Sequence, residues 1–149
     1  MRWSDLSNGV WTLPDSKAGR THEVPISATA QSILDRCPKR GEFVFTKRVK
    51  APIGVSSTWK ARIAPDIPHW TLHDLRRTAA SGMARLGVQP HVIARVLNHA
   101  ETGITGRVYV RHGWLDEKRQ ALDLWAAKVD AVVAEQPGPA EVVLMEAAR

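Results

Sequence analysis

The segment Thr71–Gly87, which reads TLHDLRRTAASGMARLG, decides the fold of this chain. Thr71 and Asp74 form a T-x-x-D pattern that resembles a capping box at a helix start, and Gly87 is typical of a helix end. Between these two signals apolar residues recur at helical spacing, which predicts one buried face: Leu72, Leu75, Ala79, Met83 and Leu86. We therefore expect an amphipathic helix over residues 71–86.

The chain is predicted to stay helical downstream of this segment. Pro90 is typical of the first turn of a second helix, whose end falls near His99. The buried face of that helix comprises Val92, Ile93, Val96 and Leu97. A third, short helix is expected to contain Tyr109, and a long amphipathic helix then ends before Pro137. The apolar stripe of the long helix comprises Leu115, Leu122, Trp125, Val129 and Val132. Residues 140–149, AEVVLMEAAR, allow one more helix.

The N-terminal third favours β-structure. Val10–Leu13 and His22–Ile26 flank Asp15–Arg20, whose glycine and aspartate favour a turn, so we expect a hairpin. Arg2–Leu6 supplies either a third strand or a lead-in to the first.

Residues 27–69 join the two halves. Ser27 is predicted to cap a short helix that ends near Arg36 and turns Ile33 and Leu34 inward. Prolines and glycine interrupt 46–69, which leaves room for a helical turn around Ser57–Arg62 at most. The predicted fold class is α+β and mainly α, with an N-terminal β-hairpin or small antiparallel sheet packed on a helical bundle.

Length and composition narrow the class of protein. The 149 residues suit one domain, and 44% hydrophobic residues are enough for a packed core. The single cysteine, Cys37, excludes an internal disulfide and a cysteine zinc site. No apolar run is long enough to span a bilayer, and the N-terminus lacks a signal peptide's apolar region. These features favour the cytoplasm and no membrane partner.

The charge is unevenly distributed. The formal net charge is +6, from 21 basic and 15 acidic residues, and all but one of the basic residues lie within 1–130. Residues 36–62 contain eight basic residues against Glu42 alone: Arg36, Lys39, Arg40, Lys47, Arg48, Lys50, Lys60 and Arg62. Such a cluster suits a polyanion such as nucleic acid, although a solvated basic face is an equally good interpretation of composition alone.

Four side chains have the chemistry of phosphate transfer. His73 and Arg76 lie three residues apart on the predicted helix 71–86 and therefore on one face, whereas Arg77 points elsewhere, to solvent or DNA. His99 and Tyr109, the only tyrosine, follow in the chain. A guanidinium binds phosphate oxygens, an imidazole donates to phosphate or accepts a proton, and a phenol can act as nucleophile. Singly, each residue is more often a capping, surface or packing residue.

The order and local sequence of these residues resemble one family. Trp70–Thr78 is similar to the H-D-L-R-R-T element of tyrosine recombinases, the phage integrase family, and Leu97–His99 resembles its L-G-H element. Val108–Arg111 resembles the family's nucleophile segment, and Glu117–Leu122 the helix that follows it in phage and prophage integrases. The resemblance runs from about Arg2 to Val129.

The resemblance implies a role for five residues in site-specific DNA recombination. Tyr109 would attack a DNA phosphodiester and form a 3′-phosphotyrosyl link. Arg76 would clamp the non-bridging oxygens, and His99 would donate a hydrogen bond to the same phosphate. His73 would orient or deprotonate the tyrosine, and Lys17, which matches the family's hairpin lysine, would protonate the leaving 5′-oxygen. The chemistry needs no cofactor and no metal.

The resemblance also has consequences for partners and domains. Double-stranded DNA is the expected partner. The full-length protein is expected to form a homo-tetramer on DNA, and this chain alone a monomer. The expected location is the nucleoid within the cytoplasm. Residues 1–134 would form the catalytic domain without its N-terminal helices, and 135–149 a tail or exchange helix. The family's first catalytic arginine has no match here, since Arg2 is a poor substitute, so we expect a fragment that is inactive alone.

Two other functions remain open from the sequence. The chain could be a non-catalytic remnant that binds DNA or partner subunits with the same fold. A metal-dependent nuclease that uses His73 and His99 is a weaker alternative, because no carboxylate joins them in a ligand pattern.

Overall fold

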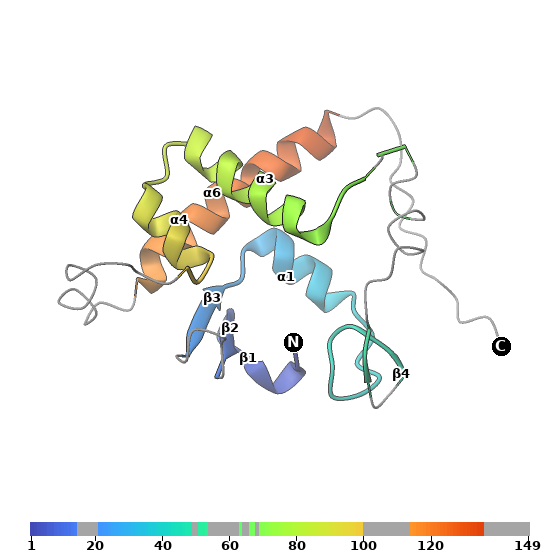
Figure 1. Ribbon diagram of the computed structural model, residues 1–149. Helices are drawn as coiled ribbons and strands as arrows, with labels where there is room; N and C mark the ends of the chain where they lie inside the picture. Colours follow the sequence, from blue (N-terminus) through green and yellow to red (C-terminus); the bar gives the residue numbers. More distant parts are fainter. Residues whose placement is uncertain are drawn as a thin grey trace.

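The structure is a computed structural model that describes residues 1–14, 21–48, 51–53, 63, 66–67, 69–99 and 114–135 (Figure 1). Within these residues a three-stranded antiparallel sheet lies beside four α-helices, which confirms the predicted α+β, mainly helical class. Helix α6 (Leu115–Ala134) is central, because it contacts strand β3 (His22–Pro25) and helices α1 (Ala28–Asp35), α3 (Leu72–Arg85) and α4 (Pro90–Val96). Among the described residues, none of the helices combines the length and apolar character that crossing a bilayer requires.

The sheet confirms the predicted hairpin, and most of Arg2–Leu6 leads into the third strand instead of forming it. The 3-10 turn η1 (Trp3–Asp5) leads into β1 (Leu6–Ser7), which pairs with β2 (Val10–Leu13). β2 in turn pairs with β3, with Trp11 opposite Val24. Asn8 and Gly9 connect β1 and β2 with φ angles of 51° and 68°, the two positive values that a tight type I′ hairpin loop needs. The turn predicted at residues 15–20 lies outside the described residues.

Helix α1 follows the sheet and packs against α6. Ser27 caps it, as predicted, by accepting a hydrogen bond from the Ala30 amide at 3.3 Å. Thr29 Oγ1 donates to Asp130 Oδ2 of α6 at 2.5 Å. Leu34 is buried, but Ile33 is 48% exposed, so the prediction that both face inward is wrong. Consecutive helical residues point about 100° apart, and this short helix buries only one of the two directions.

The segment after α1 contains more β-structure than expected. β4 (Thr46–Arg48) and β5 (Ala51–Pro52) form a small antiparallel pair, in a region where the sequence predicted a helical turn at most. The pair is short enough for Pro52, which cannot donate to a ladder, to occupy its end. The turn predicted at Ser57–Arg62 lies outside the described residues.

Helices α3, α4 and α6 form the main core. Its buried members are Met83, Val92, Ile93 and Ala121. The predicted helix over 71–86 is confirmed, as are the start at Pro90 and the end of the long helix before Pro137. The helices predicted around Tyr109 and over 140–149 lie outside the described residues.

The prediction of which α3 residues are buried is partly wrong. Met83 is buried, but Leu72 and Leu75 are 52% and 56% exposed, and Leu86 is also exposed. Leu72 and Leu75 lie in the first two turns, and the described core gathers around the C-terminal half of α3. The N-terminal half of α3 therefore presents its side chains to the surface.

Candidate active site

Two predicted catalytic residues, His73 and Arg76, lie in the first half of α3. Thr71 and Asp74 fix the start of this helix: the Asp74 amide donates to Thr71 Oγ1 at 3.3 Å, and the Thr71 amide donates to Asp74 Oδ2 at 2.9 Å. Because the helix begins at Leu72, His73 and Arg76 lie one turn apart on the same face. Both side chains are exposed and thus accessible to a ligand.

The Asp74 carboxylate caps the start of α3 and forms an ion pair with Arg77. Hydrogen bonds from the side chain and backbone of Thr71 hold the pKa of the Asp74 carboxyl below its ordinary value of 3.8, with a smaller contribution from the positive charge of Arg77. The ionised carboxylate lies 3.4 Å from Arg77 Nη1. Arg77 is therefore turned toward Asp74, along the side of α3.

Arg76 joins α3 to the C-terminal end of α4. Its Nη2 donates a hydrogen bond to the carbonyl oxygen of Leu97, the residue that caps α4. A guanidinium has five N–H donors, and one carbonyl accepts only one or two of them. Arg76 is thus fixed at the α3–α4 junction with donors remaining for a phosphate.

Backbone hydrogen bonds at the end of α4 fix the position of the chain at His99. The His99 amide donates to the Ala94 carbonyl at 2.9 Å and the Asn98 amide to the Arg95 carbonyl at 3.2 Å, the two bonds of a Schellman motif. That motif needs a left-handed residue in its middle, and Asn98 supplies it with a φ of 53°. His99, exposed at the surface, lies two residues beyond the carbonyl that Arg76 contacts.

The described part of the predicted site therefore consists of two residues on α3 and one just beyond the end of α4. Arg76 contacts the end of α4 two residues before His99, and His73 shares the face of α3 with Arg76. Lys17 and Tyr109 lie outside the described residues.

The sequence did not predict the carbonyl of Leu97 or the left-handed Asn98 as parts of the junction. A signal for Asn98 was present: it occupies the glycine position of the family's L-G-H element, and asparagine is the residue that most often replaces glycine there.

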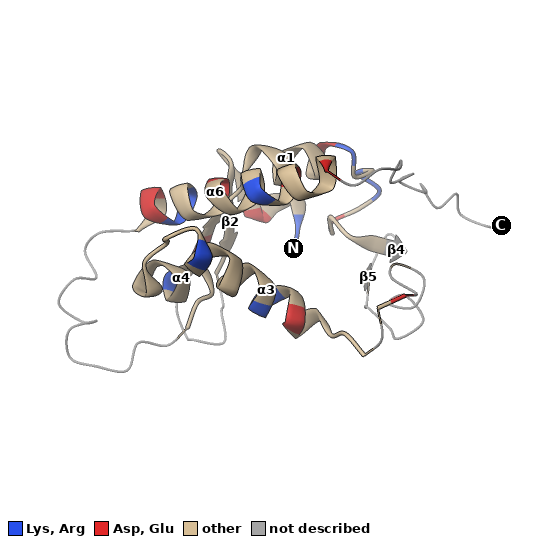
Figure 2. Cartoon of the chain, turned by 90° about the horizontal axis from the view of Figure 1, so that it is seen from above, with Lys and Arg blue, Asp and Glu red and all other residues tan. Residues whose placement is uncertain are grey.

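The predicted DNA-binding residues have different surroundings. Lys39 Nζ lies 5.2 Å from the centroid of the Trp3 ring, and Arg40 is exposed. Lys47 and Arg48 belong to β4, with side chains outside the described set, and Lys50, Lys60 and Arg62 are not described. Basic residues are also spread over α3, α4 and α6 (Figure 2). They comprise Arg76, Arg77, Arg85, Arg95, Lys118, Arg119 and Lys128.

Arg2, the poor substitute for a first catalytic arginine, has partners of its own. Its Nη1 lies 2.8 Å from Glu42 Oε1, and its guanidinium carbon lies 5.6 Å from the centroid of the Phe43 ring. These contacts hold Arg2 against the segment that contains Glu42 and Phe43.

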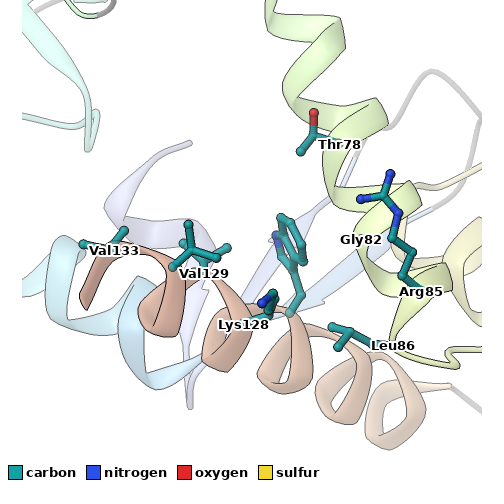
Figure 3. A pocket seen from close by; sticks show the side chains of 9 residues that line it. Thr78, Gly82, Arg85, Leu86, Lys128, Val129 and Val133 are labelled. Atoms are coloured by element: carbon teal, nitrogen blue, oxygen red, sulfur yellow. The ribbon is translucent and has the colours of Figure 1, made fainter. Parts of the chain in front are cut away.

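A separate groove lies between α3 and α6 (Figure 3). Its volume is about 410 Å³, and it is lined mainly by apolar side chains around Trp125, together with Thr78, Arg85 and Lys128. Trp125 fits against α3 because Gly82 has no side chain: a Cβ there would lie 2.7 Å from the Trp125 Cε3 atom. None of His73, Arg76 and His99 lines this groove, so it is distinct from the α3–α4 junction.

The described residues contain no group of three or more histidine, cysteine, aspartate or glutamate side chains arranged to hold a metal ion.

Two comparisons with known proteins give matches to this chain. Residues 1–113 match the model of the phage integrase family. Over 140 residues the chain is 31% identical to the Prophage integrase IntA of Escherichia coli (strain K12), an alignment that covers 87% of this chain and 34% of that protein. The chain thus spans about a third of the length of this curated relative. No solved structure matches significantly. The match to the family model, which extends over most of the chain, shows that this chain belongs to the phage integrase family.

Proposed function

We propose that this chain supplies catalytic residues of a site-specific DNA recombinase that cuts and rejoins DNA through Tyr109. The observation that supports the proposal most directly is the α3–α4 junction, where the Arg76 guanidinium bonds to the Leu97 carbonyl two residues before His99. An exposed guanidinium anchored at the end of α4, with an exposed imidazole two residues further along the chain, suits a phosphate group of a large, external substrate.

The proposed reaction is a transfer of one phosphate linkage. The Tyr109 oxygen forms a bond to phosphorus as the bond from phosphorus to the 5′-oxygen of DNA breaks. His73 takes the phenol proton, and Lys17 gives a proton to the departing 5′-oxygen. A 5′-hydroxyl of another strand then attacks the phosphotyrosine and reverses these steps. The energy of the first bond is kept in the covalent link, so the exchange requires no nucleotide hydrolysis.

Arg76 and His99 would act on the negative charge of the transition state. The non-bridging oxygens gain charge as the fifth bond to phosphorus forms, and donors already fixed in place stabilise that charge most effectively. Loss of one such donor typically slows catalysis by about 10²- to 10³-fold. The bond to the Leu97 carbonyl anchors the Arg76 guanidinium, and the Schellman motif fixes the backbone at His99.

The isolated chain is proposed to be nearly inactive on ordinary DNA. The family resemblance matches Arg76 to the second of two arginines and finds no match for the first, while Arg2 is paired with Glu42. A methylphosphonate at the cleaved position removes one negative oxygen and with it much of the need for a second cation. We therefore expect Tyr109-dependent cleavage of methylphosphonate DNA and little cleavage of phosphodiester DNA.

The remaining partners are proposed from the family and the charge. The partner is double-stranded DNA, bound in part by the basic residues of 36–62 and by Arg77, with an affinity that falls steeply with salt. Within the full-length protein we propose a homo-tetramer on DNA, with residues 1–134 as the catalytic unit and 135–149 as a tail.

The test uses a pool of nicked duplexes with random sequence around a methylphosphonate linkage, so that no recognition sequence has to be assumed. The expected product is an SDS-resistant protein–DNA adduct that persists in EDTA and is lost in Tyr109→Phe. Arg76→Ala should lower its yield about 100-fold, whereas the control Arg85→Ala, at the other end of α3, should not. DNA binding without any adduct would instead support the non-catalytic alternative.

A further inference from the structure

We draw no further inference here: the strongest candidate, the apolar groove between α3 and α6 around Trp125, carries none because nothing in the described part of the chain shows what covers it.

Discussion

Replacement of Asn98 by glycine is predicted to stabilise the protein. Asn98 occupies the left-handed position of the Schellman motif at the end of α4, with a φ of 53°. Helix α3 ends in the same motif, and there Gly87 occupies the position with a φ of 82°. In addition, Asn98 Oδ1 is buried and has no hydrogen-bond partner among the described residues. Glycine would remove both unfavourable features.

The expected magnitude is a balance of three contributions. Relief of the left-handed conformation contributes about 0.5–1 kcal/mol, since asparagine tolerates it better than most residues do. Removal of a buried, unpaired oxygen contributes about 1–3 kcal/mol. The greater freedom of glycine in the unfolded chain opposes these by about 0.5–1 kcal/mol. The backbone contributions nearly cancel, so the net effect of Asn98→Gly is a stabilisation of about 1–3 kcal/mol, or about 2–12 °C in Tm for a chain of this size.

The assay is urea and thermal unfolding followed by far-UV circular dichroism. Asn8→Gly is the matched control, because Asn8 is also left-handed, with a φ of 51°, but is exposed in the β1–β2 loop. The control should change the free energy of unfolding by less than about 0.5 kcal/mol, since the backbone contributions nearly cancel. A destabilised Asn98→Gly, or equal effects at the two positions, would refute the reasoning about the buried oxygen.

Three further changes test the helices that support the site. Thr71→Val, which removes the cap of α3, should lower the free energy of unfolding by about 1 kcal/mol. In the unaltered chain, stability falls as the pH drops through the lowered pKa of the Asp74 carboxyl. Asp74→Asn should remove this contribution to the fall. Gly82→Ala should destabilise by about 1–3 kcal/mol, because the new methyl group meets Trp125; replacing Trp125 by leucine in the same chain should restore part of the loss. Burial lowers the pKa of the Lys118 amine below its ordinary 10.5, so the folded chain binds fewer protons than the unfolded chain just below that pH and stability should rise with pH there. In Lys118→Met this rise, measured by urea unfolding at a series of pH values, should disappear.

Local signals in the sequence were sufficient to predict where the helices begin and end, but not which of their side chains are buried. The capping pattern at Thr71, Gly87 as a stop and Pro90 as a start act within one or two turns, and the structure confirms all three. The exposure of Leu72 and Leu75 could not be predicted, because periodicity identifies an apolar stripe but not how far the neighbouring helix covers it. The same holds for Ile33 on α1.

The sequence indicated the residues of the candidate site but not the contacts that hold them. The motifs identified His73, Arg76 and His99, and regular helix geometry already places the first two on one face. The bond from Arg76 to the Leu97 carbonyl depends on how α3 and α4 cross, which is a property of the packed core.

The most direct test of the central claim is the identity of the residue that bonds to DNA. Covalent complexes from the methylphosphonate pool can be digested with trypsin and nuclease and the modified peptide sequenced by mass spectrometry. The account predicts that the nucleotide is attached to Tyr109, in the tryptic peptide Val108–Arg111, and that Tyr109→Phe yields no modified peptide. Attachment to any other residue, or cleavage that survives Tyr109→Phe, would contradict it.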